Sequence, residues 1–386
     1  MKGNPTDPDR RRWLARGLWA LGVFACGGVL ARRGVARRDA LGPPDANGLR
    51  LPAGFQSRIV ARSGQPVGPR GHRWHAAPDG GAVFAAGDGG WVYVSNSELA
   101  DGAGGVGALR FDARGALVDA YPILTGSDRN CAGGATPWGT WLSCEEVERG
   151  RVFECDPFGR RPAAAVPALG RFLHEAAAVD PRDGCVYLTE DAPDGLLYRW
   201  RPARPGPGRP DWARGTLQAA RVDDDGRVTW LAVPDPDAAV LPCRRQLPEA
   251  RRFAGGEGIA WSDGKVYFTT KLDNRVWVLD PAQGRLGVLY DDDAWPDPVL
   301  RGVDNVTVSP GRWLYVAEDG DDMQIVALPP DGGPPLAVVQ VVGHGGSEVT
   351  GPAFSPDGRR LYFSSQRGAG GRSEDGVTYE VRGPFR

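Results

Sequence analysis

Acidic residues recur along this chain in two kinds of position. One group opens short runs of small and apolar residues and consists of Glu175, Glu257, Asp304 and Glu348. A second group ends or directly follows short runs that begin with an aromatic residue, and it consists of Glu98, Glu145, Glu146, Glu190, Asp191, Glu318 and Asp319. If the two kinds of run pair as antiparallel hairpins, the start of one lies beside the end of the other. The pattern therefore predicts that these carboxylates crowd together at one place.

Crowded carboxylates in a low-dielectric cleft repel one another strongly, and multivalent cations would neutralise them. An oxygen-rich set of ligands suits a hard cation such as Ca²⁺, so the recurrence predicts a metal site. The alternative is that each carboxylate only solvates a loop or fixes a neighbouring hairpin, and for any single residue this alternative stays open. The acidic runs Asp223–Asp225 and Asp291–Asp293 fall outside the register, and we predict that they are turns.

The elements that would position these carboxylates repeat with a period of about fifty residues. Each aromatic-led run has the order aromatic, apolar, small, polar, and the aromatic residues are Tyr93, Trp141, Tyr187, Tyr267, Tyr315 and Tyr362. They are 46 to 48 residues apart except for one interval of 80. Short strands and turns at such a period are typical of a β-propeller blade, so six repeats predict six blades. The long interval holds residues 201–252, rich in Pro and Arg, which we predict to be an irregular insertion between blades three and four.

The domain boundaries follow from this repeat. Each small-residue run is predicted to be the inner strand of a blade, joined to the aromatic-led strand by a tight hairpin. The segment Phe55–Ala61 has no blade of its own, and we expect it to complete the last blade beside Thr378–Val381, which would close the ring. Residues 51–386 are thus assigned to the propeller and residues 39–50 to a linker.

Composition supports an all-β fold and disfavours several other classes. The 386 residues include 56 Gly and 34 Pro, which interrupt long helices. They also include 13 Trp, 12 Phe and 9 Tyr, too many aromatic residues for a disordered chain. Beyond residue 38 there are 37 basic and 46 acidic residues. This acidic excess disfavours nucleic acid as a partner, because nucleic-acid binding needs basic patches.

The amino-terminal residues 1–38 resemble an export signal. The run from Arg10 to Leu14 contains three consecutive Arg residues and precedes an uncharged stretch from Gly17 to Ala31. A pair of Arg before a mildly apolar segment indicates a twin-arginine signal, so we expect export by the twin-arginine machinery to the periplasm or the exterior. The alternative is an amino-terminal membrane anchor.

The densest motif runs from Cys131 to Glu146 and has the form Cys-x-Gly-Gly-x-Thr-Pro-Trp-Gly-Thr-Trp-Leu-x-Cys-Glu-Glu. This string resembles the alkaline phosphatase PhoX family, which comprises exported, calcium- and iron-dependent propeller phosphatases. The likeness covers roughly residues 50 to 380. It continues through His174-Glu175, Leu188–Asp191, Glu257–Trp261 and Glu348–Gly358.

The resemblance implies a ligand set. It makes Cys131 a thiolate ligand of Fe³⁺, and it assigns iron and calcium to Glu145, Glu146, Glu175, Asp191, Glu257 and Asp304. Of these residues, Cys131, Glu175 and Glu257 would be catalytic. A thiolate suits the softer transition metal and carboxylates suit Ca²⁺. The alternative for Cys131 is a small buried hydrophobic residue.

Two departures from the family pattern concern the substrate. The family is expected to carry a basic residue just before the Glu-Gly pair, but here Gly255 and Gly256 precede Glu257. The carboxy-terminal Gln-His-Pro-Gly of the family is replaced by Gln366-Arg367-Gly368. The metals are therefore expected to be retained while substrate binding has diverged, and no substrate-binding residue is assigned.

The function that these observations favour is hydrolysis of a small phosphomonoester at an iron and calcium cluster in the mouth of the propeller channel, by a monomer. One alternative is a calcium-dependent hydrolase of another ester, such as a lactone or phytate. The other is a non-catalytic propeller that retains calcium only for structure.

Overall fold

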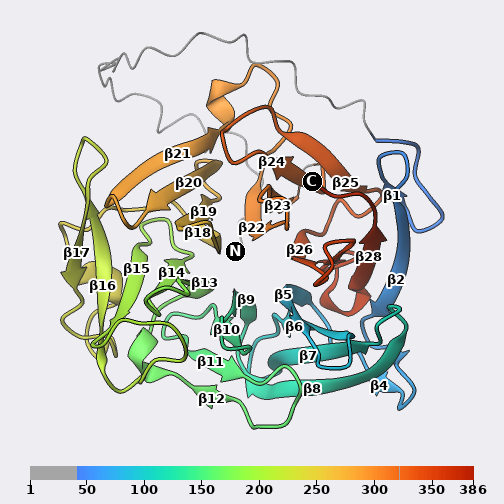
Figure 1. Cartoon of the computed structure of the whole chain (residues 1–386), viewed down its shortest axis with the longest axis horizontal. Coiled ribbons are helices and arrows are strands. Elements are labelled where there is room, and N and C mark those ends of the chain that lie inside the picture. The colour runs from blue at the N-terminus through green and yellow to red at the C-terminus, as the bar shows by residue number, and fades with distance from the viewer. Residues whose placement is uncertain (1–40, 321) are drawn as a thin grey trace, which may run out of the picture. The chain divides into compact units, whose positions relative to one another are not determined.

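The computed structural model describes residues 41–320 and 322–386, and these residues form six β-sheets around a central axis (Figure 1). The sheets are antiparallel, and in each the innermost strand is joined to the second by a tight hairpin, as predicted from the repeat. The all-β, six-bladed propeller expected from the sequence is confirmed. The export signal expected in residues 1–38 lies outside the described residues. No helix in the described part of the chain has the length and hydropathy that a bilayer crossing requires.

Three blades each consist of four strands from one continuous segment. They are blade one with β5 (Pro78–Ala85), β6 (Trp91–Ser97), β7 (Gly104–Phe111) and β8 (Leu117–Ser127); blade two with β9 (Asn130–Ala135), β10 (Trp141–Glu145), β11 (Val152–Cys155) and β12 (Ala164–Ala165); and blade four with β18 (Gly256–Ser262), β19 (Lys265–Thr270), β20 (Arg275–Asp280) and β21 (Arg285–Asp291).

Blade three has a fifth strand, and this corrects the expectation for residues 201–252. Its strands are β13 (His174–Val179), β14 (Val186–Glu190), β15 (Leu197–Pro202), β16 (Gly215–Val222) and β17 (Val228–Ala232). The expected irregular insertion thus contains two regular strands, because β16 pairs along β15 and buries Leu217 and Ala219 in the blade core. The irregular part is the connection from residue 233 to 255, which holds the 3-10 turn η4 (Cys243–Arg245).

Blades five and six are each completed by a strand from the start of the described chain. Blade five comprises β22 (Val303–Val308), β23 (Leu314–Glu318), β24 (Gln324–Leu328), β25 (Leu336–Val341) and β1 (Leu49–Arg50), and blade six comprises β26 (Val349–Phe354), β27 (Arg360–Ser365), β28 (Val377–Arg382) and β2 (Gln56–Arg62). The predicted ring closure is confirmed, since Ile59 pairs with Tyr379 and Ala61 with Thr378. The expected linker 39–50 ends instead in β1, because the fully buried Leu49 pairs with Val341.

The remaining short elements lie outside the six blades. They are the hairpin of β3 (Pro66–Val67) and β4 (His72–Arg73) and the 3-10 turns η3 (Pro167–Leu169), η5 (Asp292–Ala294) and η6 (Ser373–Asp375). The two acidic runs predicted as turns lie where expected. Asp223–Asp225 is in the β16–β17 hairpin, and Asp291–Asp293 joins the end of β21 to η5.

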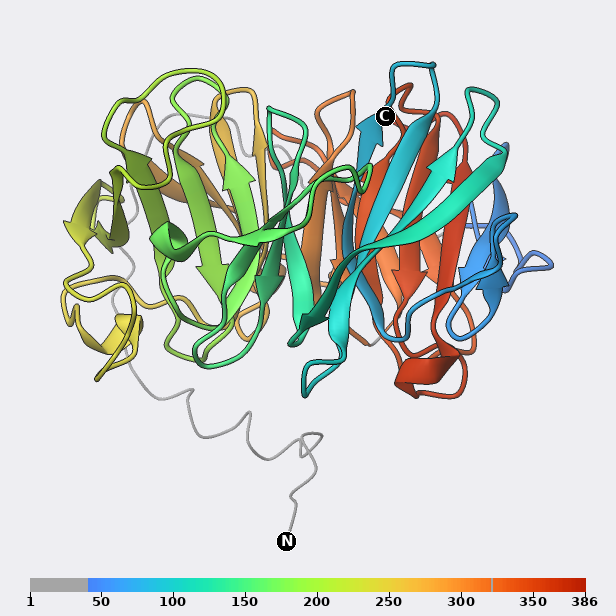
Figure 2. The ribbon, with the colours of Figure 1, turned by 90° about the horizontal axis from the view of Figure 1, so that it is seen from below.

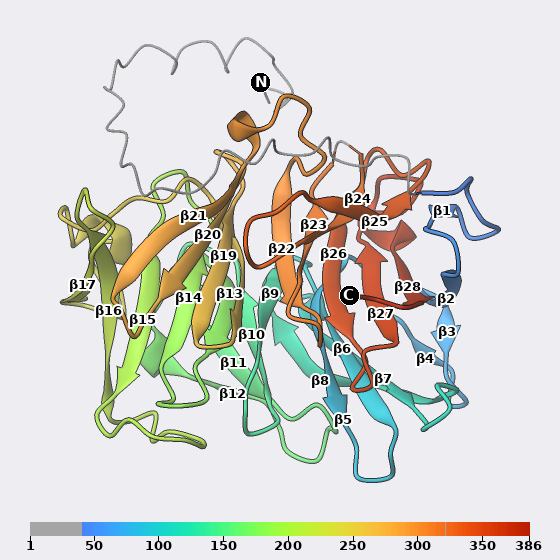
Figure 3. The same cartoon turned by 45° about the horizontal axis from the view of Figure 1, so that its top comes forward.

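Small residues line the axis because the inner strands of neighbouring blades approach closely there. The inner strands β5, β9, β13, β18, β22 and β26 surround the axis (Figures 1 and 3), and Figure 2 shows strands running between the two faces of the propeller. A Cβ on Gly134 of β9 would lie 1.9 Å from the carbonyl oxygen of Ala177 in β13. A Cβ on Gly258 of β18 would lie 2.4 Å from the amide nitrogen of Val306 in β22. The larger side chains therefore pack between blades. All six aromatic residues that lead the repeated runs, from Tyr93 to Tyr362, are buried there.

Ring closure by β2 yields the first prediction. Ala61 is buried among Trp74, Tyr93 and Tyr362, so Ala61→Asp would place an unpaired carboxylate in an apolar cluster. We expect the free energy of unfolding to fall by about 3 kcal/mol, measured by urea denaturation. The control is Gln56→Asp at the exposed start of the same strand, which should change it little. Equal effects of the two substitutions would contradict a packed closing strand.

Candidate metal centre

The second strands of three blades end in two adjacent acidic residues whose side chains have different tasks. The pairs are Glu145-Glu146, Glu190-Asp191 and Glu318-Asp319. Successive side chains on a strand point to opposite faces, so one member of each pair turns into the blade while the other turns toward the axis. In each pair, one carboxylate therefore has a structural role and the other is available to bind a cation.

The first member of each pair holds the loops of its own blade. Glu145 accepts hydrogen bonds from Arg151 Nε at 2.9 Å and from the Asp128 amide at 3.0 Å. Glu190 accepts from the Tyr198 hydroxyl at 2.9 Å and pairs with Arg244 at 3.0 Å. Glu318 accepts hydrogen bonds from two backbone amides, those of Arg301 and Gln324.

Glu145, implied as a metal ligand by the family resemblance, is therefore engaged elsewhere. Both of its carboxylate oxygens accept hydrogen bonds from Arg151, and it belongs to none of the ligand clusters of the described residues. Its neighbour Glu146 is the member of the pair that faces Cys131 and Glu175.

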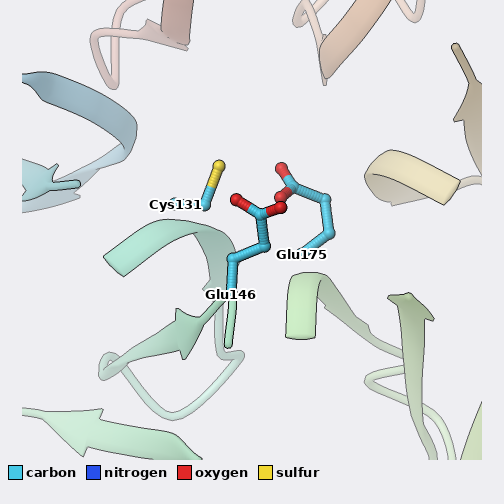
Figure 4. A group of neighbouring side chains, drawn as sticks. All are labelled: Cys131, Glu146 and Glu175. Atoms are coloured by element: carbon cyan, nitrogen blue, oxygen red, sulfur yellow. The ribbon is translucent and has the colours of Figure 1, made fainter. Parts of the chain in front are cut away.

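The first ligand cluster joins blades two and three. The Cys131 sulfur and one carboxylate oxygen each of Glu146 and Glu175 lie within 4.8 Å of one another. Figure 4 shows the three side chains converging from separate segments on one point. A thiol and two carboxylates in this arrangement can bind one cation between them.

Three further clusters continue around the axis. They are Glu175, Glu257 and Asp304; Asp304, Asp319 and Glu348; and Asp79, Glu98 and Glu348, each with ligand atoms within 4.8 Å of one another. Adjacent clusters share Glu175, Asp304 or Glu348, so the donors form one continuous set to which all six blades contribute. We call this set, together with Asp191, the acidic mouth.

The acidic mouth contains six of the seven metal ligands implied by the resemblance. Cys131, Glu146, Glu175, Glu257 and Asp304 each belong to a ligand cluster. Asp191 belongs to none, but its charge acts on Glu146, Glu257 and Asp304. Glu145 is the seventh residue and lies apart.

Sequence reasoning missed Asp79 as a member of the acidic mouth. Asp79 follows Pro78, the residue of β5 that pairs with the end of the second strand of its blade at Ser97. Cys131 follows Asn130, which pairs in the same way with Glu145. The signal that could have identified Asp79 is the sequence Asp-Gly-Gly at residues 79–81. It places a possible ligand just before two glycines, as Cys131 stands just before Gly133 and Gly134.

Besides Arg129, which contacts Glu98 at 3.5 Å, two basic side chains reach the acidic mouth. Lys271 Nζ lies 2.8 Å from a Glu257 oxygen and 3.3 Å from an Asp319 oxygen. Arg367 contacts Glu348 at 2.7 Å. Neither was assigned a role from the sequence, although Arg367 stands at one of the two positions that depart from the family pattern.

Burial and mutual repulsion dominate the electrostatics of the acidic mouth. Burial, followed by the charge of Glu257, raises the pKa of Glu175 well above its ordinary value. Glu175 is only 1% exposed, and neither of its carboxylate oxygens has a hydrogen-bond partner in the described part of the chain. Burial and Asp191 raise the pKa of Glu146 to about 8. Burial also raises the pKa of Asp304 to about 6, although Lys271 opposes the rise. A cation beside these groups would reverse the shifts, so the donor set fits a metal.

The pKa of the Cys131 thiol is raised by burial and by the charge of Asp79. A thiol binds metal as the thiolate, so binding at this cluster must release a proton. This requirement favours a strongly polarising cation at the Cys131 end of the acidic mouth.

A family match covers half of the chain. Residues 94–288 match the model of the family described as Alkaline phosphatase PhoX. Among curated protein sequences, none matches this chain significantly.

Solved structures with the same propeller fold belong to varied proteins. Pseudomonas fluorescens PhoX, in complex with vanadate as a transition-state analogue, is 16% identical, with a TM-score of 0.71 and coverage of 87% of this chain and 96% of that chain. The PQQ domain of pyranose dehydrogenase from Coprinopsis cinerea is 13% identical, with a TM-score of 0.51 and coverage of 88% and 98%. A protein of unknown function from Bacteroides thetaiotaomicron is 9% identical, with a TM-score of 0.51 and coverage of 85% and 76%. At these identities the likeness shows the fold.

The raised pKa values predict how the stability of the metal-free protein depends on pH. Folding raises the pKa of Glu146 from 4.5 to about 8 and that of Asp304 from 3.8 to about 6, so the folded state holds these protons more tightly than the unfolded state. The stabilisation is complete below the unfolded pKa and is lost as the pH rises through the folded one. We expect the urea midpoint of metal-stripped protein to fall between about pH 4.5 and pH 8.

Saturating calcium should flatten this profile, because a bound cation takes the place of the protons. Glu146→Gln should reduce the dependence of the urea midpoint on pH at the high-pH end of this window, even without calcium. A midpoint of the metal-stripped protein that rises with pH over the same window would contradict the electrostatic description of the acidic mouth.

Proposed function

The chain belongs to the alkaline phosphatase PhoX family, whose members are metal-dependent phosphatases, and from this premise we propose that its acidic mouth holds Fe³⁺ and Ca²⁺ and hydrolyses small phosphomonoesters. As a family member the chain is a phosphoric monoester hydrolase. The observation that carries the proposed location is the unpartnered, buried Glu175 carboxylate, which belongs to two ligand clusters at once. A buried carboxylate without a hydrogen bond is costly unless a cation neutralises it.

The two metals divide according to the donors. The cluster of Cys131, Glu146 and Glu175 contains the one thiol of the acidic mouth and would hold iron, since thiolate is a soft ligand. The clusters that contain Glu257, Asp304 or Glu348 offer oxygen alone and would hold calcium. When bound, such cations act as Lewis acids that stabilise the charge of a phosphoryl group under attack.

The protein's own contribution is to fix the donors and to leave one side open. Glu175 and Glu257 are almost fully buried, whereas the side chains of Asp319 and Arg367 are about one third exposed. The buried donors hold the inner side of the acidic mouth, and the exposed groups lie where a substrate enters. Preorganised charge of this kind stabilises a transition state without reorganisation during the reaction.

We further propose that the enzyme acts as a monomer outside the cytoplasm. The six blades of one chain supply every donor of the acidic mouth, so the site needs no second copy. Export is supported by the Arg-rich segment from Arg10 to Leu14 and the uncharged stretch after it.

Calcium removal gives a test of the oxygen-rich clusters. Stripping calcium leaves the carboxylates to repel one another, so the free energy of unfolding should fall by roughly 3–4 kcal/mol relative to protein at a few hundred times the dissociation constant. Thermal unfolding with and without chelator measures this difference. An unchanged midpoint would favour carboxylates that only solvate loops.

A matched substitution sharpens this test. Glu175→Gln removes a repelling charge and a ligand together, so it should raise the midpoint in chelator and reduce the increment that calcium adds. Glu374→Gln, at an exposed carboxylate in η6, is the control and should change neither quantity.

Cys131→Ser tests the iron end of the acidic mouth and the activity. A serine hydroxyl is too weakly acidic to replace the thiolate, so the variant should lose iron, its charge-transfer colour and hydrolysis of p-nitrophenyl phosphate, while calcium still stabilises the fold. Metal analysis, absorption spectra and turnover are the measurements. The control is Cys185→Ser, at a buried thiol directly before β14 and so at the opposite end of that strand from Glu190, and it should keep iron and activity.

Two outcomes would separate the parts of the proposal. An iron-bearing protein that fails to hydrolyse phosphomonoesters would retain the metal assignment and overturn the activity. A colourless protein whose Cys131→Ser variant behaves like the parent would overturn the iron assignment.

A further inference from the structure

Lys271 stands at a position where four other blades carry an acidic residue. In blades one, two, three and five the residue after the last paired residue of the second strand is Glu98, Glu146, Asp191 and Asp319, respectively. In blade four the last paired residue is Thr270, and Lys271 follows it. The equivalence is structural, because the propeller repeats the same hairpin in every blade. Blade four thus supplies a cation where those blades supply an anion.

The backbone fixes Lys271 at the rim of the acidic mouth. Its amide donates a hydrogen bond to the Gly255 carbonyl at 2.8 Å, which ties the residue to the segment leading into β18. The side chain is 30% exposed, so the ammonium lies between the buried donors and the opening. No rearrangement of the main chain is needed to bring it there.

The ammonium forms an ion pair with one carboxylate from each of two ligand clusters. It contacts Glu257 at 2.8 Å and Asp319 at 3.3 Å. Glu257 belongs to the cluster with Glu175 and Asp304, and Asp319 belongs to the cluster with Asp304 and Glu348. A calcium ion needs its oxygen ligands at about 2.3–2.6 Å, so it cannot lie between Glu257 and Asp319 while the ammonium is there.

The Cys131 cluster differs from these two clusters. No ion pair within the described part of the chain reaches the side chains of Cys131, Glu146 or Glu175, whereas Arg367 pairs with Glu348 and Arg129 with Glu98. Basic side chains therefore form ion pairs with donors of the other clusters and leave the donors of the Cys131 cluster to external cations.

We propose that Lys271 is a built-in cation that fills one metal position of the acidic mouth, between Glu257 and Asp319, and so lowers by one the number of divalent cations that this chain binds. The inference rests on the proposed metal centre and adds its stoichiometry. The ammonium offsets one carboxylate charge permanently, so this part of the mouth stays neutralised when metal is scarce.

The test is to count calcium ions on metal-stripped full-length protein by equilibrium dialysis against CaCl₂. Lys271→Met removes the charge and nearly keeps the length of the side chain, and it should bind one more calcium per chain than the parent. Lys271→Arg keeps the charge and should bind the parental number. Lys265→Met is the matched control, because Lys265 begins the same strand β19 at its other end and is exposed.

An unchanged count in Lys271→Met would overturn the inference while leaving the metal centre intact. A parent that binds no calcium would overturn the calcium part of the proposed function, and a single ion gained by Lys271→Met would then still support the role of Lys271. If stripped Lys271→Met does not fold, ions are counted by elemental analysis after folding in CaCl₂. Failure to fold even in saturating CaCl₂ would also overturn the inference, since calcium would then not replace the ammonium.

Discussion

Repulsion among buried carboxylates at the axis is the constraint on which the rest of this structure depends. Glu175, Glu257 and Asp304 share one cluster with ligand atoms within 4.8 Å, and all three are nearly inaccessible to water. In the absence of a cation such groups hold protons well above their ordinary pKa, and that is how the metal-free chain tolerates them. The same repulsion makes the mouth an effective cation site, because each bound ion relieves several unfavourable interactions at once.

The propeller can maintain this constraint because it is closed. The donors come from all six blades, so no single hairpin holds all of the repelling groups together. The ring does so through the pairing of β2 with β28 and the packing of aromatic residues between blades. Close approach of the inner strands then requires small residues such as Gly134 and Gly258, since a Cβ there would meet the backbone of the next blade. Closure, packing and site geometry are therefore linked.

Adjacent acidic residues illustrate how little separates a structural carboxylate from a ligand. Glu145 and Glu146 differ by one position, yet Glu145 is held by Arg151 while Glu146 faces Cys131 and Glu175. The alternation of side chains along a strand decides the difference. Lys271 shows the opposite effect, because it places one basic residue at a position that is acidic in four of the other blades.

The sequence by itself determined the fold class, the six blades, the strand that closes the ring and seven of the clustered carboxylates, because each depends on a pattern that repeats along the chain, whereas Cys131 was assigned only through the family resemblance. Hairpin register follows from residue order, so that order alone assigns Glu146 and Glu175 to the same end of their blades. Only the tertiary structure decided which member of each acidic pair reaches the axis, that residues 215–232 extend blade three, and that Asp79 and Lys271 join the mouth. These features depend on which face of a strand meets the neighbouring blade, and that contact between distant segments leaves no periodic signal in the sequence.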